Sequence, residues 1–328
     1  MCNYNSIQST EKSSVLVDKT KSGKVRPWRE KKISNVGYWE LLHILEFKKA
    51  ERVKDCAEIL EYKVDIETSE INLYRVWFCK SRLCPMCNWR RAMKHGIQSK
   101  KVVTEVIRQK PTVRWLFLTL SVKNVYDGEE LNQSLSDIAK GFNRMMKYKK
   151  ITKNLVGFMR ATEVTVNEID NSYNQHIHVL LAVEPTYFKN TENYVTQKQW
   201  IQFWKKAMKL DYDPVVHIQI VKPKNKGKDA MQSAIDETAK YPVKDTDFMT
   251  DDEQKNLKRL SDLEEGLHRK RLISYGGLLK EIHKKLNLDD AEDGDLIHAD
   301  DEQEKADEEG FSIVAMWNWE RRNYFIKD

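Results

Sequence analysis

Short apolar runs alternate with amphipathic stretches through the middle of the chain, and this order constrains the fold more than any other feature. Apolar runs of strand length occupy residues Trp115–Val122, Val156–Val166, His176–Val183 and Val215–Val221. Apolar side chains at helical spacing mark three further stretches, Leu131–Tyr148, Thr196–Leu210 and Asp229–Tyr241. The order strand, helix, strand, strand, helix, strand, helix predicts an α+β fold in which helices flank a central, mostly antiparallel sheet.

Four of the five cysteines lie upstream of this region, at Cys56, Cys79, Cys84 and Cys87. A Cys-x2-Cys turn such as Cys84–Cys87 lets two thiolates face one ion, and a further pair completes a tetrahedron. The residue types therefore predict a structural zinc site, because four protein ligands leave no position open for chemistry. Two alternatives remain open: buried free cysteines without metal, and His95 as a ligand in place of Cys56.

Basic side chains surround the cysteines. Helical periodicity predicts a helix over Ser34–Lys54 before them and a basic amphipathic helix over Met93–Ile107 after them. Four cations near the cluster are candidates for contacting DNA phosphates, namely Arg82, Arg90, Arg91 and Lys94. The alternative is a solvated basic surface without a ligand.

The charge layout also indicates an anionic partner. The net charge of +6 is unevenly spread, with positive charge concentrated at Lys80–Lys110 and Lys222–Lys228 and negative charge at Asp289–Glu309. This layout favours nucleic acid, although many cytosolic proteins share such a balance. No apolar run approaches the roughly 20 residues that span a bilayer, and the first residues do not resemble a signal peptide. We therefore expect a cytoplasmic protein that engages no membrane.

Composition divides the chain into four parts. Residues 1–33 are polar and aperiodic and are predicted to form a mobile N-terminal arm. Residues 34–112 form the zinc- and DNA-binding region, and residues 113–250 form the core that contains the sheet. Residues 251–328 are predicted to be a charged helical region with a solvated acidic linker over 289–309, for which the alternative is a segment that mimics DNA and acts as a brake. Within it, Phe311–Ile326 regains aromatic residues and is expected to pack back on the body.

The run His176–Val183 carries a candidate metal site. Residues two apart on a strand share a face, so His176 and His178 project together while Ile177 and Val179 point the other way. The preceding strand offers Glu163, which a hairpin would place beside the two imidazoles. Two nitrogens and one carboxylate suit Mn²⁺ or Mg²⁺ and leave positions open for water and a phosphate oxygen. The alternative for Glu163 is an ordinary cross-strand ion pair.

A third candidate group closes the last predicted helix. Glu237 and Tyr241 stand four apart, so they share a helix face, and Pro242 stops the helix. A phenol beside a divalent ion can attack phosphorus, Glu237 can act as general base, and Lys240 can neutralise developing charge. Taken alone, a tyrosine at a helix end is more often a packing residue.

Together these pieces resemble the HUH endonucleases, and among them the initiators of rolling-circle plasmid replication (Rep proteins) of small Gram-positive plasmids. The resemblance rests on the His-hydrophobe-His strand, the downstream helix bearing Tyr241, the strand Phe117–Leu120, and the stretches Phe78–Arg91 and Ala239–Asp245. It covers roughly residues 56–247. One departure is Asn174, where members of the family often have another histidine. We expect it to remove an outer-shell contact while sparing the chelating pair.

The resemblance implies a fold and a mechanism. The core would have the HUH nuclease fold, and the protein would bind a hairpin origin with a single-stranded nick site. Tyr241 would attack the scissile phosphate, keep the 5′ phosphate and free a 3′ hydroxyl as primer. Glu237 would activate the water that ends the cycle. A host helicase and a DNA polymerase would be partners, and a homodimer is a further candidate.

Other functions make different demands on the sequence. A conjugative or mobilisation relaxase shares this chemistry, but its tyrosine usually precedes the histidines, whereas Tyr241 follows them. A non-catalytic, zinc-dependent DNA-binding regulator would need the cysteines but not Tyr241. A zinc hydrolase would want further ligands soon after His178, and the apolar residues that follow offer none.

Overall fold

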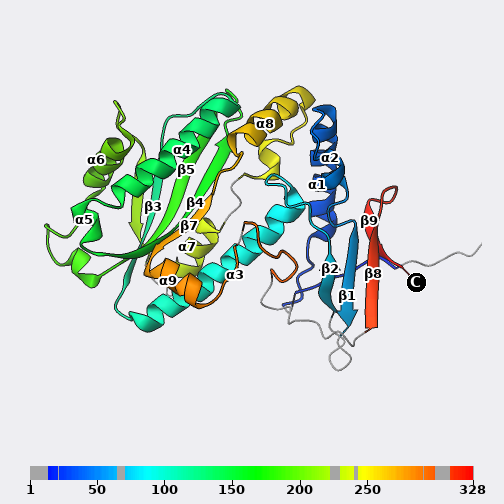
Figure 1. Ribbon diagram of the computed structural model, residues 1–328, viewed down its shortest axis with the longest axis horizontal. Helices are drawn as coiled ribbons and strands as arrows, with labels where there is room; N and C mark the ends of the chain where they lie inside the picture. Colours follow the sequence, from blue (N-terminus) through cyan, green and yellow to red (C-terminus); the bar gives the residue numbers. More distant parts are fainter. Residues whose placement is uncertain are drawn as a thin grey trace, which may run out of the picture.

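The computed structural model describes residues 14–20, 22–64, 71–221, 230–239, 243–290, 292–299 and 311–327. Two antiparallel sheets organise this part of the chain (Figure 1). The larger has the strand order β6-β3-β5-β4-β7, and the smaller has the order β2-β1-β8-β9. The predicted α+β class and the mostly antiparallel central sheet are therefore confirmed.

The five-stranded sheet contains the strands predicted from the apolar runs. Its members are β3 (Arg114–Ser121), β4 (Leu155–Val166), β5 (Tyr173–Val183), β6 (Val216–Ile220) and β7 (Ile273–Gly277). Strands β4 and β5 form a hairpin in which Glu163 pairs with His176. Strand β3 lies on the other side of β5, with Thr119 opposite His178. The sheet register thus brings Glu163, His176, His178 and Thr119 together within an otherwise apolar sheet.

Helices cover both faces of this sheet (Figure 1). One face packs against α4 (Gly128–Met145) and α6 (Gln197–Met208), burying Ile177, Val179 and Leu181 of β5. The other packs against α3 (Pro85–Gln109), α7 (Ala230–Thr238) and α9 (Leu278–Lys285), burying Leu180 and Ala182. The strict alternation of β5 explains this arrangement, since successive side chains point to opposite faces. The histidines consequently lie on the face covered by α3 and α7.

Local capping fixes where several helices begin. Asp127 accepts a hydrogen bond from the backbone N–H of Glu130 at the start of α4. Thr196 and Gln199 form a reciprocal capping box at the start of α6. Asp252 caps α8 (Glu253–Gly266), which packs against α4. Each cap satisfies backbone donors that a helix end otherwise leaves unpaired. Shorter elements are α5 (Lys149–Thr152), η1 (Pro185–Phe188) and η2 (Asp245–Asp247).

The smaller sheet corrects the prediction of a helical C-terminal region. It joins β1 (Ile59–Val64) and β2 (Ile71–Val76) to β8 (Phe311–Asn318) and β9 (Asn323–Ile326). In its described residues, the C-terminal region therefore combines α8 and α9 with the strands β7, β8 and β9. Aromatic and β-branched residues favour this outcome once a partner strand is present, and β8 pairs with β1 along its length.

The N-terminal region also differs from prediction. Helix α1 (Trp28–Ile44) starts earlier than predicted, and a turn at Glu46, which has a positive φ, separates it from α2 (Ala50–Lys54). Upstream of α1, the described residues are not a free arm: the Trp28 indole donates to the buried Asp18 carboxylate at 2.7 Å. A polar composition concealed this buried hydrogen bond. Residues 1–13 lie outside the described part of the chain. None of the helices that the structure describes is long and apolar enough to cross a membrane.

Candidate active site

Three polar side chains meet on the face of the large sheet beneath α7. Oε2 of Glu163 lies 3.2 Å from Nε2 of His176 and 2.9 Å from Nε2 of His178. The three ligand atoms all lie within 4.8 Å of one another, and Glu163 and His178 are buried. The hairpin and the strand alternation thus produce the predicted grouping. Two imidazoles and one carboxylate form a donor set that fits a divalent ion with open positions.

Hydrogen bonds on the far side of each ring orient the two imidazoles. Nδ1 of His176 lies 3.0 Å from Oδ1 of Asn174, and Nδ1 of His178 lies 3.2 Å from Oγ1 of Thr119. The Asn174 amide in turn donates to Oδ1 of Asn124 at 2.8 Å. The expectation that Asn174 removes an outer-shell contact is therefore wrong, because Asn174 supplies one. Such contacts leave each Nε2 facing Glu163.

The electrostatics of the group favour an ionised carboxylate. Burial raises the pKa of Glu163, but hydrogen bonds from His176 and His178 outweigh burial and hold the pKa well below its usual range. The carboxylate is thus already available as a ligand at neutral pH. The ring of Phe117 stacks against His178, with 5.5 Å between centroids, and closes one side of the group.

Helix α7 brings a second carboxylate to the same place. Oε1 of Glu237 lies 3.8 Å from Nε2 of His178, and the Glu237 side chain is about one-third exposed. Ala234 and Ile235 fix the helix on the sheet through buried apolar contacts. Lys240 and Tyr241, the other two predicted catalytic residues, lie outside the described residues. The flanking Ala239 and Val243 are both buried.

The four upstream cysteines form the second candidate metal centre. The sulfur of Cys87 lies 3.6 Å from the sulfurs of Cys56 and of Cys79, and Cys84 lies 3.7 Å from Cys56. A tetrahedron with Zn–S bonds of about 2.3 Å has sulfur–sulfur edges of about 3.8 Å, so the spacing fits zinc. All four side chains are buried. Cys56, and not His95, completes the group.

Two side chains from α1, neither of them predicted from the sequence pattern, support the cysteines. Nδ2 of Asn35 lies 3.4 Å from the sulfur of Cys84, and the buried Lys32 ammonium donates to the carbonyl of Cys56 at 2.7 Å. Burial lowers the pKa of Lys32, while the nearby Cys56 and Cys84 sulfurs oppose that shift. A fixed cation beside four thiolates offsets their excess negative charge. Lys32 and Asn35 lie too far upstream in sequence for spacing to reveal them.

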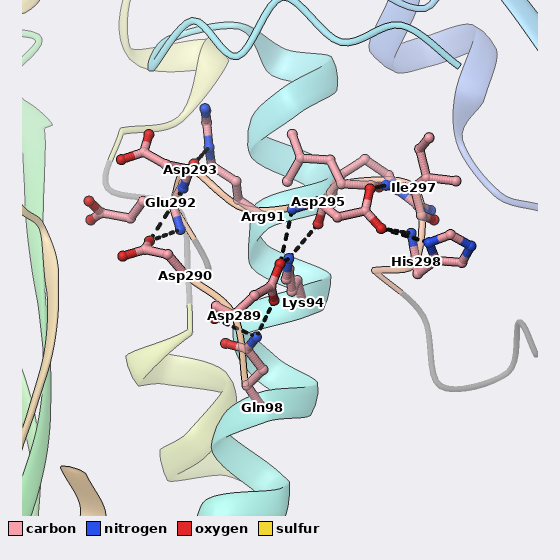
Figure 2. A network of polar contacts seen from close by, with 12 residues as sticks. Arg91, Lys94, Gln98, Asp289, Asp290, Glu292, Asp293, Asp295, Ile297 and His298 are labelled. Atoms are coloured by element: carbon pink, nitrogen blue, oxygen red, sulfur yellow. Dashed lines mark hydrogen bonds and ion pairs between the residues drawn. The ribbon is translucent and has the colours of Figure 1, made fainter. Parts of the chain in front are cut away.

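The predicted DNA-contacting cations on and near α3 face an acidic segment of the same chain (Figure 2). Arg90 is fully buried and donates to the carbonyls of Leu296 and Ile297. Arg82 and Arg91 contact Glu292, and Lys94 contacts Asp289. The expectation of a solvated linker is therefore wrong for residues 289–290 and 292–299. Residues 300–309 lie outside the described part of the chain.

Comparisons with known proteins agree with these features. The family model described as replication protein matches residues 70–325. A replication protein of Staphylococcus aureus is 84% identical over 236 residues, which cover 72% of this chain and all of that protein. The protein rep of Lactiplantibacillus plantarum is 52% identical over 320 residues, covering 96% of this chain and 99% of the relative.

A more distant relative covers the chain equally well. The protein rep of Streptococcus pneumoniae is 43% identical over 317 residues, covering 96% of both chains. No solved structure matches the chain. The resemblance to plasmid Rep initiators is thereby confirmed: the chain belongs to the replication protein family.

Proposed function

We propose that this Rep protein initiates rolling-circle replication by nicking one strand of plasmid origin DNA and retaining its 5′ phosphate on Tyr241. The observation that carries the proposal is the convergence of Glu163, His176 and His178 beneath Glu237. Membership of the replication protein family supports it. The antiparallel sheet with a His-x-His strand at its centre supports assignment of the core to the HUH nuclease fold.

Glu163, His176 and His178 would hold a divalent ion, Mn²⁺ or Mg²⁺, through one oxygen and two nitrogens. A bound ion supplies charge that polarises the scissile phosphate and offsets negative charge in the transition state. The protein contributes the orientation. Asn174 and Thr119 fix the rings so that each Nε2 points toward the shared centre.

Tyr241 stands two residues after Ala239, the buried residue that follows α7. In the proposed step the phenol oxygen forms a bond to phosphorus as the bond from phosphorus to the 3′ oxygen breaks. The phenol proton leaves and the 3′ oxygen gains a proton, which frees a 3′ hydroxyl as primer. Lys240 is adjacent in sequence and would offset charge on the phosphate. A host helicase and a DNA polymerase would then extend the primer.

Glu237 has the position of a general base for the end of the cycle. Its carboxylate lies near His178 yet remains about one-third exposed, so water can reach it. It would take a proton from the water that attacks the phosphotyrosine, and the tyrosine oxygen would leave and be protonated. That hydrolysis releases the strand and restores Tyr241. Glu237 would thus be needed for the step that ends the cycle and not for the nicking step that begins it.

The cysteine centre would bind zinc as a structural ion. Cys84 and Cys87 frame the first turn of α3, and Pro85 occupies its first position. The same helix extends to the face of the catalytic sheet, where its buried valines pack. Zinc at Cys56, Cys79, Cys84 and Cys87 would therefore fix the orientation of a helix that both halves of the protein share.

Nicking of a supercoiled plasmid that carries the cognate origin tests the proposal. With Mn²⁺ the wild type should convert supercoiled to open-circular DNA, and Tyr241→Phe should not. Tyr194→Phe is a matched control, because Tyr194 is an exposed tyrosine whose contact Tyr187 packs in the core on the sheet face opposite the histidines. Wild-type nicking by Tyr241→Phe would refute Tyr241 as the nucleophile, whereas no nicking by the wild type would leave the non-catalytic regulator as the better hypothesis.

A further inference from the structure

An acidic segment occupies a basic surface of α3 in this structure (Figure 2). We call residues 289–290 and 292–295 the acidic strap, and Arg82, Arg91 and Lys94 the basic face. Lys94 forms an ion pair with Asp289 and also donates to the carbonyl of Asp295. Arg91 donates to the carbonyl of Glu292 at 2.7 Å, and Arg82 lies 3.6 Å from a Glu292 carboxylate oxygen. Predicted phosphate contacts are thus already engaged within the chain.

The hydrogen bonds between α3 and the strap all have their donors on α3. Across the described residues, every hydrogen bond between the strap and α3 is donated by α3 and accepted by a strap oxygen, including those from Gln98 to Asp289. The backbone N–H groups of Glu292 and Asp293 bond within the strap, to Asp290. The strap therefore presents only acceptors and negative charge. A DNA phosphate backbone presents the same chemistry.

Contacts outside the basic face also hold the strap: Arg271 pairs with Asp290 at 2.9 Å, and Lys80 donates to the carbonyl of Asp293 at 3.1 Å. One Glu292 oxygen accepts from the backbone N–H groups of Leu272 and Ile273, at 2.8 and 2.9 Å. Beyond the strap, Leu296 is buried in the apolar core. In contrast, Asp289 and Asp293 are exposed. The groups that Glu292 satisfies are again donors, and backbone N–H groups are also donors to phosphate oxygens in protein–DNA contacts.

The basic face borders the end of α7. One small cavity is lined by Arg82, Arg91, Ala239, Glu292 and Asp293, and Ala239 stands two residues before Tyr241. Its volume of about 30 Å³ has room for water but not for a nucleotide. DNA can reach the basic face at this point only if the strap moves away.

We propose that the basic face binds the phosphate backbone of origin DNA and that the acidic strap is an internal competitor for it. The strap occupies the basic face in the DNA-free protein and leaves when DNA binds. The proposal rests on the proposed function for its ligand, DNA, but not on the identity of the nucleophile. Each cation must lose its internal partner before it can bind a phosphate, so displacing the strap costs free energy. That cost weakens the binding of non-specific DNA, whose affinity is already low.

Fluorescence anisotropy with a labelled single-stranded oligonucleotide, without added divalent ion, tests the proposal. Asp289→Asn removes the ion pair to Lys94, and should tighten binding about two- to fivefold, the range of a partly exposed pair. Asp293→Asn makes the same charge change in the same segment. Its side chain makes no contact with the basic face among the described residues, so it should have little effect.

A double-mutant cycle separates the strap from general electrostatics. In a Lys94→Gln background, Asp289→Asn should give no further gain in DNA affinity. Lys94→Gln should also reduce the slope of log affinity against log salt concentration by about the amount expected for one phosphate contact. Equal effects of Asp289→Asn and Asp293→Asn, or a gain that persists in Lys94→Gln, would overturn the proposal. The binding assay involves no cleavage. Its outcome therefore does not depend on whether Tyr241→Phe abolishes nicking.

Discussion

The contact from Asn174 to His176 leads to a quantitative prediction about metal affinity. Asn174→Ala removes the acceptor that lies 3.0 Å from Nδ1 of His176. A neutral hydrogen bond contributes ~0.5–1.5 kcal/mol, or about two- to twelvefold in a binding constant. Loss of an outer-shell partner to a metal ligand typically costs about 10- to 100-fold. The two ranges overlap near tenfold, so we expect Asn174→Ala to bind Mn²⁺ about tenfold more weakly.

The assay follows nicking rate against Mn²⁺ concentration, beside direct calorimetric titration of Mn²⁺. Excess Mn²⁺ should rescue Asn174→Ala, since Glu163, His176 and His178 all remain, but should not rescue His176→Ala. Asn174→Asp keeps an acceptor oxygen and should retain wild-type affinity or exceed it. Wild-type affinity in Asn174→Ala would refute the argument that this amide orients the ring.

Three further outcomes are expected. Metal analysis should find one zinc per chain in the wild type and none in Cys87→Ser, whose melting temperature should fall; zinc absent from both would exclude the cluster as a zinc site. Glu237→Ala should still nick but accumulate the covalent protein–DNA product, and unchanged hydrolytic release would remove its assigned role. Burial, with a smaller contribution from His283, lowers the pKa of His95 to about 3, so the folded state disfavours its protonation. The free energy of unfolding should therefore fall as the pH drops below about 6.5, and should be ~2 kcal/mol lower at pH 5. His95→Leu should lose this dependence in denaturant melts, whereas His217→Gln, at an exposed site, should keep it.

The sequence was most informative where structure depends on neighbouring residues. Alternation along β5 was sufficient to place His176 and His178 on one face, because side-chain direction in a strand repeats every second residue. The β4–β5 hairpin then places Glu163 opposite His176, because a short connection fixes the register. The cysteine spacing likewise predicts the cluster, since Cys84 and Cys87 share one turn.

Features that depend on distant partners were missed or mistaken. The sequence predicts a DNA contact for Arg90, because Arg90 is a cation near the cysteines. Its guanidinium is instead buried and donates to the carbonyl of Leu296, which lies far along the chain. Strand β8 could not be distinguished from helix, since its pairing partner β1 lies near the other end of the sequence, and β9 pairs in turn with β8. Lys32 reaches the cysteine cluster from a separate helix, and no local pattern encodes that contact.

Identification of the residue joined to DNA tests the central claim most directly. Wild-type protein is incubated with Mn²⁺ and an oligonucleotide that carries the origin nick site, then digested and analysed by mass spectrometry. The mechanism predicts a single modified peptide in which a 5′ phosphate is attached to Tyr241, and no adduct in Tyr241→Phe. An adduct on another residue, or nicking without any covalent adduct, would contradict it.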